Sequence, residues 1–555
     1  MDQRTLLAII LSLLLVVGYQ SVMEIYFPPP EGAVIQAVEG EAPSTVSPDR
    51  DKEKNTKPPA QSSANSAGDV SVAKSQAPLP AVASSPLDSA NEPFAPFKTD
   101  LIEGHVSLKG ATLSDIKFLK HVTHLPPNSQ PIHYLTRHGA DFFFNESGFL
   151  ANQIKIPDRN TVWSLAKPDK DAKANAIHLF WDNGQGMVFE KFITLDASTY
   201  LFTVEDRVTN NTDAAVEMHH YSHFVRVEPA PESSSNAAPT DFQGPMGFLD
   251  GKRVQHPYED LRKHDVHDSA AKGWAGFSDK YFLAALITTD TNKKRFYFDF
   301  DNPAHRVGNV SDKQSIAPKS QFTRSLLLYI GPKEIKVLEH VGHDLERSID
   351  YGWFHFLAVP LVELLLVFYG FLHNFGLAII FLTLVIKALF YPLANKSYRS
   401  MNEMKKLQPK VEELRKLYAD DKQRLNEAMM KLYQDNKVNP LGGCLPIVVQ
   451  IPVFFALYKV LFLSIEMRHA PLFLWIQDLS EKDPYYVLPI LMGISMFVQS
   501  KLNPAPADPI QAKVMTYLPL VFTFLFLTFP SGLVLYWLVN NILSIIQQSY
   551  IAKNN

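Results

Sequence analysis

The sequence predicts a multi-domain protein in which a large all-β sandwich domain is joined to an α-helical polytopic membrane core. Two observations predict this fold class. Short alternating apolar runs with turn signals between them fill residues 97–330. Long apolar runs dominate the chain after Tyr351, and only 11 of the last 115 residues, 441–555, are charged. That density is half the 20% of the whole chain and is typical of membrane-spanning segments.

The average composition excludes several classes of protein and site. Lys and Arg number 53 against 57 Asp and Glu, so no positive excess is available for specific nucleic-acid binding. The single cysteine, Cys444, excludes an intramolecular disulfide and any zinc site built on several cysteines. We therefore expect no metal and no cofactor.

Residues 1–27 are predicted to form a transmembrane signal anchor, because their mostly apolar run is long enough to span a bilayer. The segment after Val17 lacks the small residues of a cleavage site, so we expect the anchor to be retained. Residues 28–96 hold 12 prolines and one aromatic residue, Phe94. Such a segment buries too little apolar surface to fold, which predicts a disordered tether.

Residues 97–340 are predicted to form the β-sandwich domain. Two apolar runs, 177–181 and 187–192, flank Asp182-Asn183-Gly184, and Asn-Gly favours the positive φ angles of a tight hairpin. Four further runs also predict strands, at 201–208, 216–227, 281–288 and 295–300. A repeat of this kind over more than two hundred residues is typical of a sandwich.

Residues 374–555 are predicted to form the membrane core. Five apolar segments are long enough to span a bilayer: about 375–395, 441–464, 485–502, 514–529 and 531–552. A sixth candidate, 353–373, contains Glu363 and is separated from the next run only by Asn374, which is too short for a hairpin between two spans.

The charges of the loops predict the topology. Residues 396–437 carry 11 Lys and Arg against 7 acids, so this loop should be cytoplasmic. The loop 466–483 has two basic and four acidic residues and should lie outside. Six spans, counting the anchor, satisfy both loops and place both termini in the cytoplasm and the β domain outside. We therefore expect 351–373 to be an interfacial amphipathic helix.

Apolar residues recur every three or four positions in the basic loop, which predicts a cytoplasmic helical hairpin of two amphipathic helices over 396–440. These helices either pack on each other or on lipid headgroups, or they present a mobile docking surface for a partner. Six basic residues are candidates for that surface: Arg399, Lys405, Lys406, Lys410, Arg415 and Lys416.

Lys387 is the most informative single residue, because it lies inside an apolar run and a charge there costs at least ~3 kcal/mol. Its ammonium group either faces a wet cavity or reaches toward the cytoplasmic headgroups. No other span offers an acidic partner. The other polar or amphipathic residues within spans that are candidates to line a groove are Thr383, Gln450, Gln499, Tyr536, Trp537, Asn540 and Asn541. Each of these alone is also compatible with an ordinary role in helix packing.

Enzyme chemistry finds little support in the sequence. The spans contain no histidine and no paired aspartates, so an intramembrane protease is not expected. In the β domain, His219, His220 and His223 share one predicted strand, but alternate residues of a strand face opposite sides. We therefore expect neither a metal site nor a catalytic residue.

An ordered series of motifs resembles the YidC/Oxa/Alb insertase family. The run 383–393, which reads TLVIKALFYPL, is similar to the family's first core span. Further matching segments occur at 407–410, 420–424, 439–444, 483–486, 488–493 and 529–537. The anchor, tether and β domain are similar to those of family members from double-membraned bacteria, so the resemblance covers almost the whole chain.

The resemblance implies an insertase and chaperone that inserts and helps to fold and assemble integral inner-membrane proteins, alone or with the Sec translocon. It implies a hydrophilic groove that is open to the cytoplasm and to lipid. Lys387 occupies the groove position where the family more usually has arginine, and Gln499 and Trp537 stand where other groove residues are expected. The resemblance also implies a bacterial inner-membrane location with the β domain in the periplasm.

The partners that the resemblance implies are nascent integral membrane proteins, the Sec translocon with its accessory subunits, membrane lipids and ribosome–nascent chain complexes. Because the chain stops at Asn555 without a basic tail, we expect ribosome contact through the cytoplasmic loops. Two alternatives stay open. A transporter with Lys387 as an anion site predicts inverted repeats, which the sequence does not show. A structural envelope protein leaves Lys387 unexplained.

Overall fold

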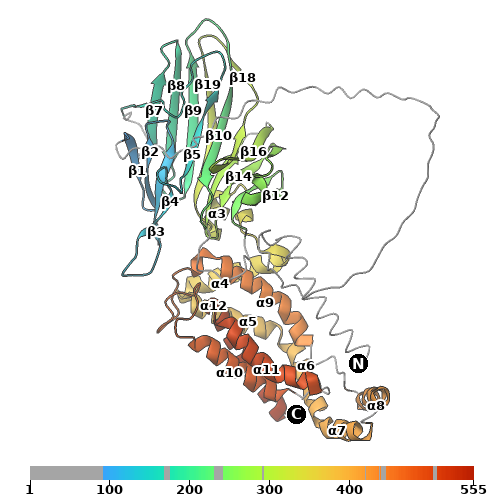
Figure 1. Ribbon diagram of the computed structural model, residues 1–555. Coiled ribbons are helices and arrows are strands. Elements are labelled where there is room, and N and C mark those ends of the chain that lie inside the picture. The colour runs from blue at the N-terminus through green and yellow to red at the C-terminus, as the bar shows by residue number, and fades with distance from the viewer. Residues whose placement is uncertain are drawn as a thin grey trace, which may run out of the picture. The chain divides into compact units, whose positions relative to one another are not determined.

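The computed structural model describes residues 92–167, 176–230, 242–289, 293–418, 421–436, 438, 445–503 and 509–554 (Figure 1). The predicted anchor 1–27, the tether up to residue 91 and Cys444 lie outside the described residues. The described residues divide into two compact units. The larger contains those within 92–408 and 438–554, and the smaller contains those within 409–436.

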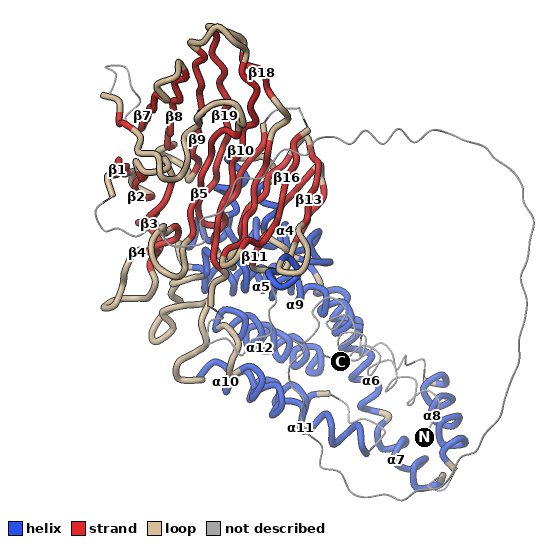
Figure 2. Tube along the Cα trace, turned by 45° about the horizontal axis from the view of Figure 1, so that its top comes forward, coloured by secondary structure: helices blue, strands red, loops and turns tan. Residues whose placement is uncertain are grey.

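Two antiparallel sheets form the β domain, as the sequence predicts (Figure 2). The first sheet runs in the order β1 (Phe94–Lys98), β2 (Ile102–Ser107), β3 (Leu113–Val122), β5 (Phe143–Leu150), β10 (Val216–Val227), β17 (Ala304–Val310), β16 (Lys294–Asp301) and β13 (Val266–Ala270), with β4 (Pro131–Leu135) beside β3 and β18 (Gln314–Ile316) beside β10. The second runs in the order β12 (Lys252–Gln255), β11 (Gly244–Leu249), β14 (Gly273–Ser278), β15 (Phe282–Thr288), β19 (Ser320–Pro332), β9 (Leu201–Asn210), β8 (Met187–Leu195), β7 (Ala176–Asp182) and β6 (Ser164–Leu165). A short helix, α2 (Tyr258–Leu261), follows β12.

Strict alternation of side chains builds the core of the domain. Along β8 every second residue is buried, including Phe189 and Ile193, because successive side chains of a strand point to opposite faces. Aromatic rings from both sheets meet between them, and Phe118 of the first sheet stacks on Phe282 of the second with ring centroids 5.0 Å apart. All six predicted strand runs fall on observed strands.

The predicted Asn-Gly hairpin differs in detail. β7 ends at Asp182 and β8 begins at Met187, so four residues connect the strands. The positive φ angles belong to Gly184 (+70°) and Gly186 (+87°), and not to Asn183. The side-chain carbonyl of Asn183 instead accepts hydrogen bonds from the N–H groups of Gln185 and Met187, at 2.7 and 3.0 Å. The turn is therefore closed by the Asn183 side chain and by two glycines.

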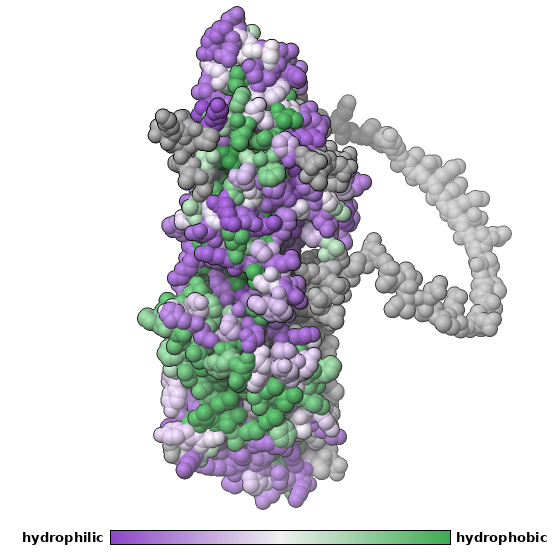
Figure 3. Space-filling model, turned by 90° about the vertical axis from the view of Figure 1, so that its left-hand side faces the viewer, coloured by the Kyte–Doolittle hydropathy of each residue, from purple (hydrophilic) through white to green (hydrophobic). Residues whose placement is uncertain are grey.

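The helical part of the larger unit follows the β domain. Its elements are α3 (Ile335–Val341), the 3₁₀ turns η1 (Leu345–Ser348) and η2 (Gly352–Phe354), α4 (His355–Leu372), α5 (Phe375–Leu389), α6 (Tyr391–Lys406), α9 (Leu445–Leu463), the turn η4 (Ile465–Met467), α10 (Val487–Leu502), α11 (Pro509–Phe526) and α12 (Ser531–Asn554). The smaller unit contributes α8 (Lys422–Asp435) and all but the first residue of α7 (Gln408–Leu417). On the face drawn in Figure 3, apolar side chains form a broad band across the helical part, whereas polar side chains cover much of the β domain and the end of the helical part away from it.

Each predicted core span coincides with a helix, namely α5, α9, α10, α11 and α12. Among the described residues, only the stretch Gly352–Leu372, which contains α4, forms an unbroken helix that is long and apolar enough to cross a membrane by itself. Three helices at predicted spans have shorter apolar stretches, Val449–Leu463 in α9, Val487–Leu502 in α10 and Lys513–Phe526 in α11. The crossing of these helices and the interfacial position of 351–373 therefore stay predictions.

The predicted span 375–395 is bent. α5 ends at Leu389, and α6 begins at Tyr391 after a turn of 67°. Pro392 explains the break, because it has no N–H to continue the helix but is well accommodated in the first turn of a new one.

Three helices, rather than two, occupy the predicted hairpin 396–440. α6 ends at Lys406 and α7 begins at Gln408, because Pro409 cannot continue the helical hydrogen bonding of α6. The side chain of Asp421 accepts a hydrogen bond from the Arg424 N–H at 3.0 Å and caps the start of α8.

A buried polar network joins the two sheets of the β domain. Lys191 of β8 donates to Asp206 of β9 at 2.5 Å and to the carbonyl of Ser147 of β5 at 3.0 Å. Asp206 also accepts a hydrogen bond from Ser147 at 2.6 Å and contacts the Nε2 atom of His220 on β10 at 2.8 Å. Burial opposes ionisation of Asp206, but the Lys191 charge and the hydrogen bonds outweigh it and hold the pKa of that carboxyl well below its usual range.

Replacing Asp206 with Asn should therefore destabilise the β domain by about 3–5 kcal/mol, because Lys191 would keep a buried charge without its counter-ion. Hydrogen exchange of β8 and β9 peptides in the full-length protein measures the change. Asp213→Asn is the control, since Asp213 is exposed and pairs with Lys319 at the surface. Equal protection in both variants would contradict a stabilising role for the network.

Acid should destabilise the β domain through a second buried group. His305 of β17 is fully buried, and its ring lies near Tyr258 and Phe300. Burial lowers the pKa of His305 to about 4, and burial also lowers the pKa of His220. A depressed pKa means that the folded state resists protonation, so the stabilising effect is complete above pH 6.5 and fades as the pH falls toward 4.

We therefore expect the free energy of unfolding of the β domain to fall by up to about 3 kcal/mol between pH 6.5 and 4 through His305 alone. His305→Phe should make this pH dependence shallower, whereas His264→Gln, a change at an exposed histidine, should not. Denaturant unfolding of the full-length protein at several pH values measures both slopes. Equal slopes for His305→Phe and the parent would refute the assignment.

Candidate functional site

Lys387 lies in the last turn of α5 and is half-buried. Its Nζ atom donates a hydrogen bond to the Oγ atom of Ser544 on α12 at 2.8 Å. Ser544 is buried and donates in turn to the carbonyl of Asn540 at 2.7 Å, one turn earlier on the same helix. The ammonium group is thus held against a polar segment of α12 and is not directed away from the helices.

The polar contacts of α12 extend to two more helices. On one side, the Asn540 side chain accepts a hydrogen bond from Gln450 of α9. On another, Asn541 donates to Ser495 of α10 at 3.0 Å, and Gln548 donates to Asn503 just after α10 at the same distance. α12 therefore carries a polar spine, which we define as Asn540, Asn541, Ser544 and Gln548. The spine links α12 to α5, to α9 and to the C-terminal half of α10.

No ion pair found among the described residues includes Lys387. Its hydrogen-bond acceptor is a neutral hydroxyl, which offers a dipole but no balancing negative charge. A positive charge held in this way among apolar helices attracts an acidic group more strongly than a lysine in bulk water, because the local dielectric is lower.

The structure brings some of the predicted groove residues together and leaves others apart. Lys387 and Gln450 both contact the polar spine. Thr383 is buried, and its hydroxyl donates to the carbonyl of Ile379 in its own helix at 2.7 Å. Gln499 is half-buried on α10 and is not joined to the spine by these hydrogen bonds.

Tyr536 and Trp537 begin the polar half of α12. Tyr536 is fully buried, one turn before Asn540. Trp537 lies in an aromatic cluster, with ring centroids 4.7 Å from Phe454 of α9 and 5.5 Å from Phe526 of α11. Its indole therefore packs α12 against α9 and α11. The role of Trp537 in a groove stays a prediction.

Sequence reasoning missed Ser544, Ser495 and Gln548. The signal was present, because Ser544 follows Asn540 by four residues and Gln548 follows Asn541 by seven, so that each pair falls on one face of a helix. Single hydroxyl or amide side chains are common in apolar runs. Only the packing of α5 against α12 shows that Ser544 accepts the hydrogen bond from Lys387.

The six basic candidates of the predicted cytoplasmic hairpin are divided between the two units. Arg399, Lys405 and Lys406 lie exposed on α6, in the larger unit. Lys410, Arg415 and Lys416 lie on α7 in the smaller unit, where Arg415 is half-buried.

The histidines of β10 form polar pairs of the β domain. His220 contacts Asp206, and His223 contacts Glu146 at 2.8 Å and the hydroxyl of Tyr297 at 2.6 Å. Within the part of the chain that the structure describes, no group of three or more His, Cys, Asp or Glu side chains is arranged to hold a metal ion.

Comparison with known proteins gives consistent matches along the chain. Residues 367–555 match the family described as 60Kd inner membrane protein, and residues 95–364 match the YidC periplasmic domain. The membrane protein insertase YidC of Magnetococcus marinus is 52% identical over 562 residues, which cover 100% of this chain and 99% of that protein. The protein of the same name from Methylococcus capsulatus is 40% identical over 461 residues, covering 82% and 84%.

Among solved structures, a crystal structure of an active YidC insertase with its first transmembrane domain resolved aligns over 82% of this chain and 94% of that chain. The TM-score is 0.37 at 19% identity.

The hydrogen bond between Lys387 and Ser544 can be measured with a double-mutant cycle. Lys387→Met and Ser544→Ala should show a coupling energy of about 1.5–3 kcal/mol, as expected for a hydrogen bond to a charged group. Thermal or denaturant unfolding of the four proteins gives this value. Ser495→Ala is the matched control, because Ser495 bonds to Asn541 and should show no coupling with Lys387.

Proposed function

The chain belongs to the YidC family of membrane protein insertases, and from this premise we propose how its residues receive a substrate. This chain, like other members of the family, is an insertase of inner-membrane proteins and not an enzyme, and it carries the periplasmic domain of the family. Our proposal concerns the site. A polar or acidic segment of the substrate enters a hydrophilic groove that is open to the cytoplasm and to lipid, and Lys387 attracts it there.

One observation carries this proposal. Lys387 places a positive charge among apolar helices, against the hydroxyl of Ser544 and without an ion-pair partner among the described residues. Because a lone charge is costly in such surroundings, water or an anionic group must stabilise it. An acidic substrate segment supplies that group while it passes.

The polar spine lowers the cost of the passage for the rest of the segment. Backbone N–H and C=O groups of an extended chain need hydrogen-bond partners wherever bulk water is absent. The amides of Gln450 and Asn540 and the hydroxyl of Ser544 offer donors and acceptors from α9 and α12. Thr383, Gln499, Tyr536 and Trp537 complete the proposed groove lining.

We propose that the apolar helix of the substrate leaves along α9 and α11. Both helices present apolar side chains outward, including Ile451 and Phe455 on α9 and Leu520 and Phe524 on α11. Phe524 is 78% exposed, which suits contact with lipid or with another apolar helix. This step needs no nucleotide, since burial of the substrate's apolar surface in lipid drives it.

Lysine in place of arginine fits this electrostatic role. The ammonium group acts as a point charge without the rigid fork that pairs with one carboxylate in a fixed geometry. It can therefore attract acidic segments of different sequence and release them again.

The orientation and the partners are also proposals. We place both termini in the cytoplasm, together with the basic hairpin, because basic loops stay inside. We propose that exposed basic residues of this hairpin, such as Lys405 on α6 and Lys416 on α7, contact ribosome–nascent chain complexes. For substrates with large outer domains, we propose joint action with the Sec translocon and its accessory subunits.

Replacing Lys387 with Glu should slow the insertion of single-span substrates with acidic outer segments by on the order of tenfold or more, because repulsion replaces attraction. Lys387→Arg should keep most of the activity. Protease protection of radiolabelled substrates in vesicles measures the rate.

Two controls separate this effect from a general loss of function. Lys387→Glu should have a smaller effect on a substrate whose outer segment is uncharged, and Lys501→Glu should change neither rate, since Lys501 lies exposed at the end of α10. Wild-type insertion of acidic substrates by a well-folded Lys387→Glu variant would refute the proposal.

A further inference from the structure

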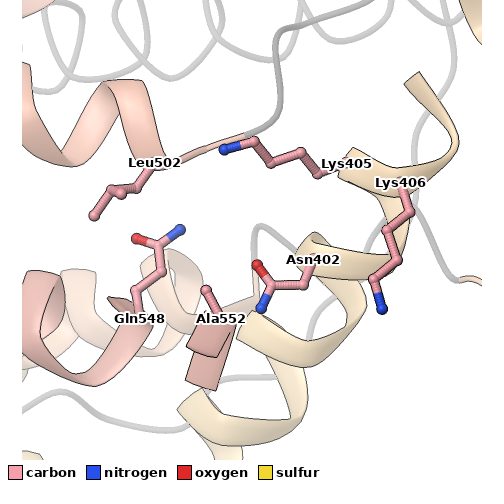
Figure 4. Close-up of a pocket in the computed structure, with 6 residues that line it drawn as sticks. All are labelled: Asn402, Lys405, Lys406, Leu502, Gln548 and Ala552. Atoms are coloured by element: carbon pink, nitrogen blue, oxygen red, sulfur yellow. The ribbon is translucent and has the colours of Figure 1, made fainter. Parts of the chain in front are cut away.

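A small pocket lies between the ends of three helices in the larger unit, and Gln548 is the one member of the polar spine among its described lining residues. Its volume is about 270 Å³. Among the described residues, six line it: Asn402, Lys405 and Lys406 of α6, Leu502 of α10, and Gln548 and Ala552 of α12 (Figure 4). Two of these six side chains are basic and none is acidic, so the described lining is positive.

Two polar atoms of the pocket are buried without a hydrogen-bond partner among the described residues. They are the Nδ2 atom of Asn402, which is a donor, and the Oε1 atom of Gln548, which is an acceptor. Gln548 is 1% exposed, and its other amide atom is already engaged by Asn503 at 3.0 Å. Because buried polar atoms are nearly always hydrogen-bonded, the pocket lacks an occupant that both accepts and donates.

The lysines indicate the charge of that occupant. In Figure 4 the amine of Lys405 projects over the pocket toward the end of α10, whereas the amine of Lys406 lies beyond Asn402, on the far side from Leu502 and Gln548. The Lys405 amine and an amide N–H group together suit a phosphate group, which has several acceptor oxygens and a negative charge. The free acceptor of Gln548 then requires a donor a few bonds away from the phosphate, and a neutral hydroxyl suits this place better than an ammonium group, which the charge of Lys405 would repel.

The surroundings indicate that the phosphate belongs to a lipid. Leu502 lines the pocket, and Val498 and Ile494 precede it by one and two turns on the same face of α10. Ile494 is 55% exposed and Val498 is 43% exposed, so an apolar surface leads along α10 to the pocket. The volume equals that of about nine water molecules, which suits a headgroup but not a whole lipid.

We propose that this pocket binds the headgroup of an anionic phospholipid that carries a free hydroxyl, of the phosphatidylglycerol type. Its phosphate accepts hydrogen bonds from Lys405 and Asn402, and its glycerol hydroxyl donates to Gln548. The acyl chains lie along Val498 and Ile494. The inference requires α10 and α12 to lie in a bilayer, but it does not depend on the role of Lys387.

Native mass spectrometry of the full-length protein with three lipids tests the proposal. Phosphatidylglycerol carries both the charge and the hydroxyl, phosphatidylmethanol carries the charge alone, and phosphatidylethanolamine has no net charge. We expect one lipid to be retained in the order phosphatidylglycerol, phosphatidylmethanol, phosphatidylethanolamine. Equal retention of all three would overturn the proposal.

Two variants address the two halves of the headgroup. Lys405→Gln should lower the affinity for both anionic lipids about fivefold, which is the effect of one lysine charge near a membrane surface. Gln548→Met should lower the retention of phosphatidylglycerol to that of phosphatidylmethanol and leave the retention of phosphatidylmethanol unchanged. Lys501→Gln is the control, because Lys501 lies at the same end of α10 but outside the pocket and should retain both lipids as the parent does.

Lys405 is exposed, so its replacement should not disturb the core. The Lys405→Gln variant therefore tests the proposal even if Gln548→Met folds poorly. Unchanged phosphatidylglycerol retention in Lys405→Gln would overturn the assignment. Added inorganic phosphate distinguishes a free anion from a lipid. Displacement of the lipid by phosphate at millimolar concentration would assign the pocket to the free ion and would also overturn the proposal, whereas persistence of the lipid supports it.

Discussion

The arrangement of the helical part depends on one constraint, which is that a polar side chain buried among apolar helices needs a hydrogen-bond partner. Three residues of the polar spine, Asn540, Asn541 and Ser544, satisfy this constraint by bonding to Gln450, Ser495 and Lys387 of three neighbouring helices. Between apolar helices in lipid, such contacts and close packing take the place of the hydrophobic effect. The same side chains that fix the helices relative to one another therefore also create the polar surface on which the proposed groove depends.

The β domain is tied to the helical part by contacts of the segment that follows α9. Arg468 donates hydrogen bonds to the carbonyls of Val122 and Thr123, at the end of β3, at 2.6 and 2.9 Å. Glu466 accepts a hydrogen bond from the N–H of Ile335 at the start of α3, and Lys280 lies 4.0 Å from the ring of Phe462. The loop after α9 is therefore held to the β domain by Arg468 and Glu466, and α9 itself contacts Lys280 through Phe462.

The sequence was sufficient to predict most helices and strands, but not the bends and breaks between helices. Alternation of apolar residues located six strands of the sandwich, and the apolar runs located the five core helices, because both follow from local periodicity. The sequence did not predict the bend at Phe390 or the break at Leu407, because the apolar pattern continues through both. Pro392 and Pro409 mark these positions, since proline has no backbone N–H to continue a helix. Ser544 was missed because only the packing of α5 on α12 selects it from several similar hydroxyls.

The bend after α5 has a consequence for the surrounding lipid. Fifteen residues of α5 rise only about 22 Å, at 1.5 Å a residue, whereas the hydrocarbon core of a bilayer is about 30 Å thick. A crossing by so short a helix produces a hydrophobic mismatch, to which the bilayer adapts by becoming thinner beside it. Where α5 crosses the bilayer as the sequence predicts, a segment that enters next to Lys387 has a shorter apolar distance to cross than in an unperturbed bilayer.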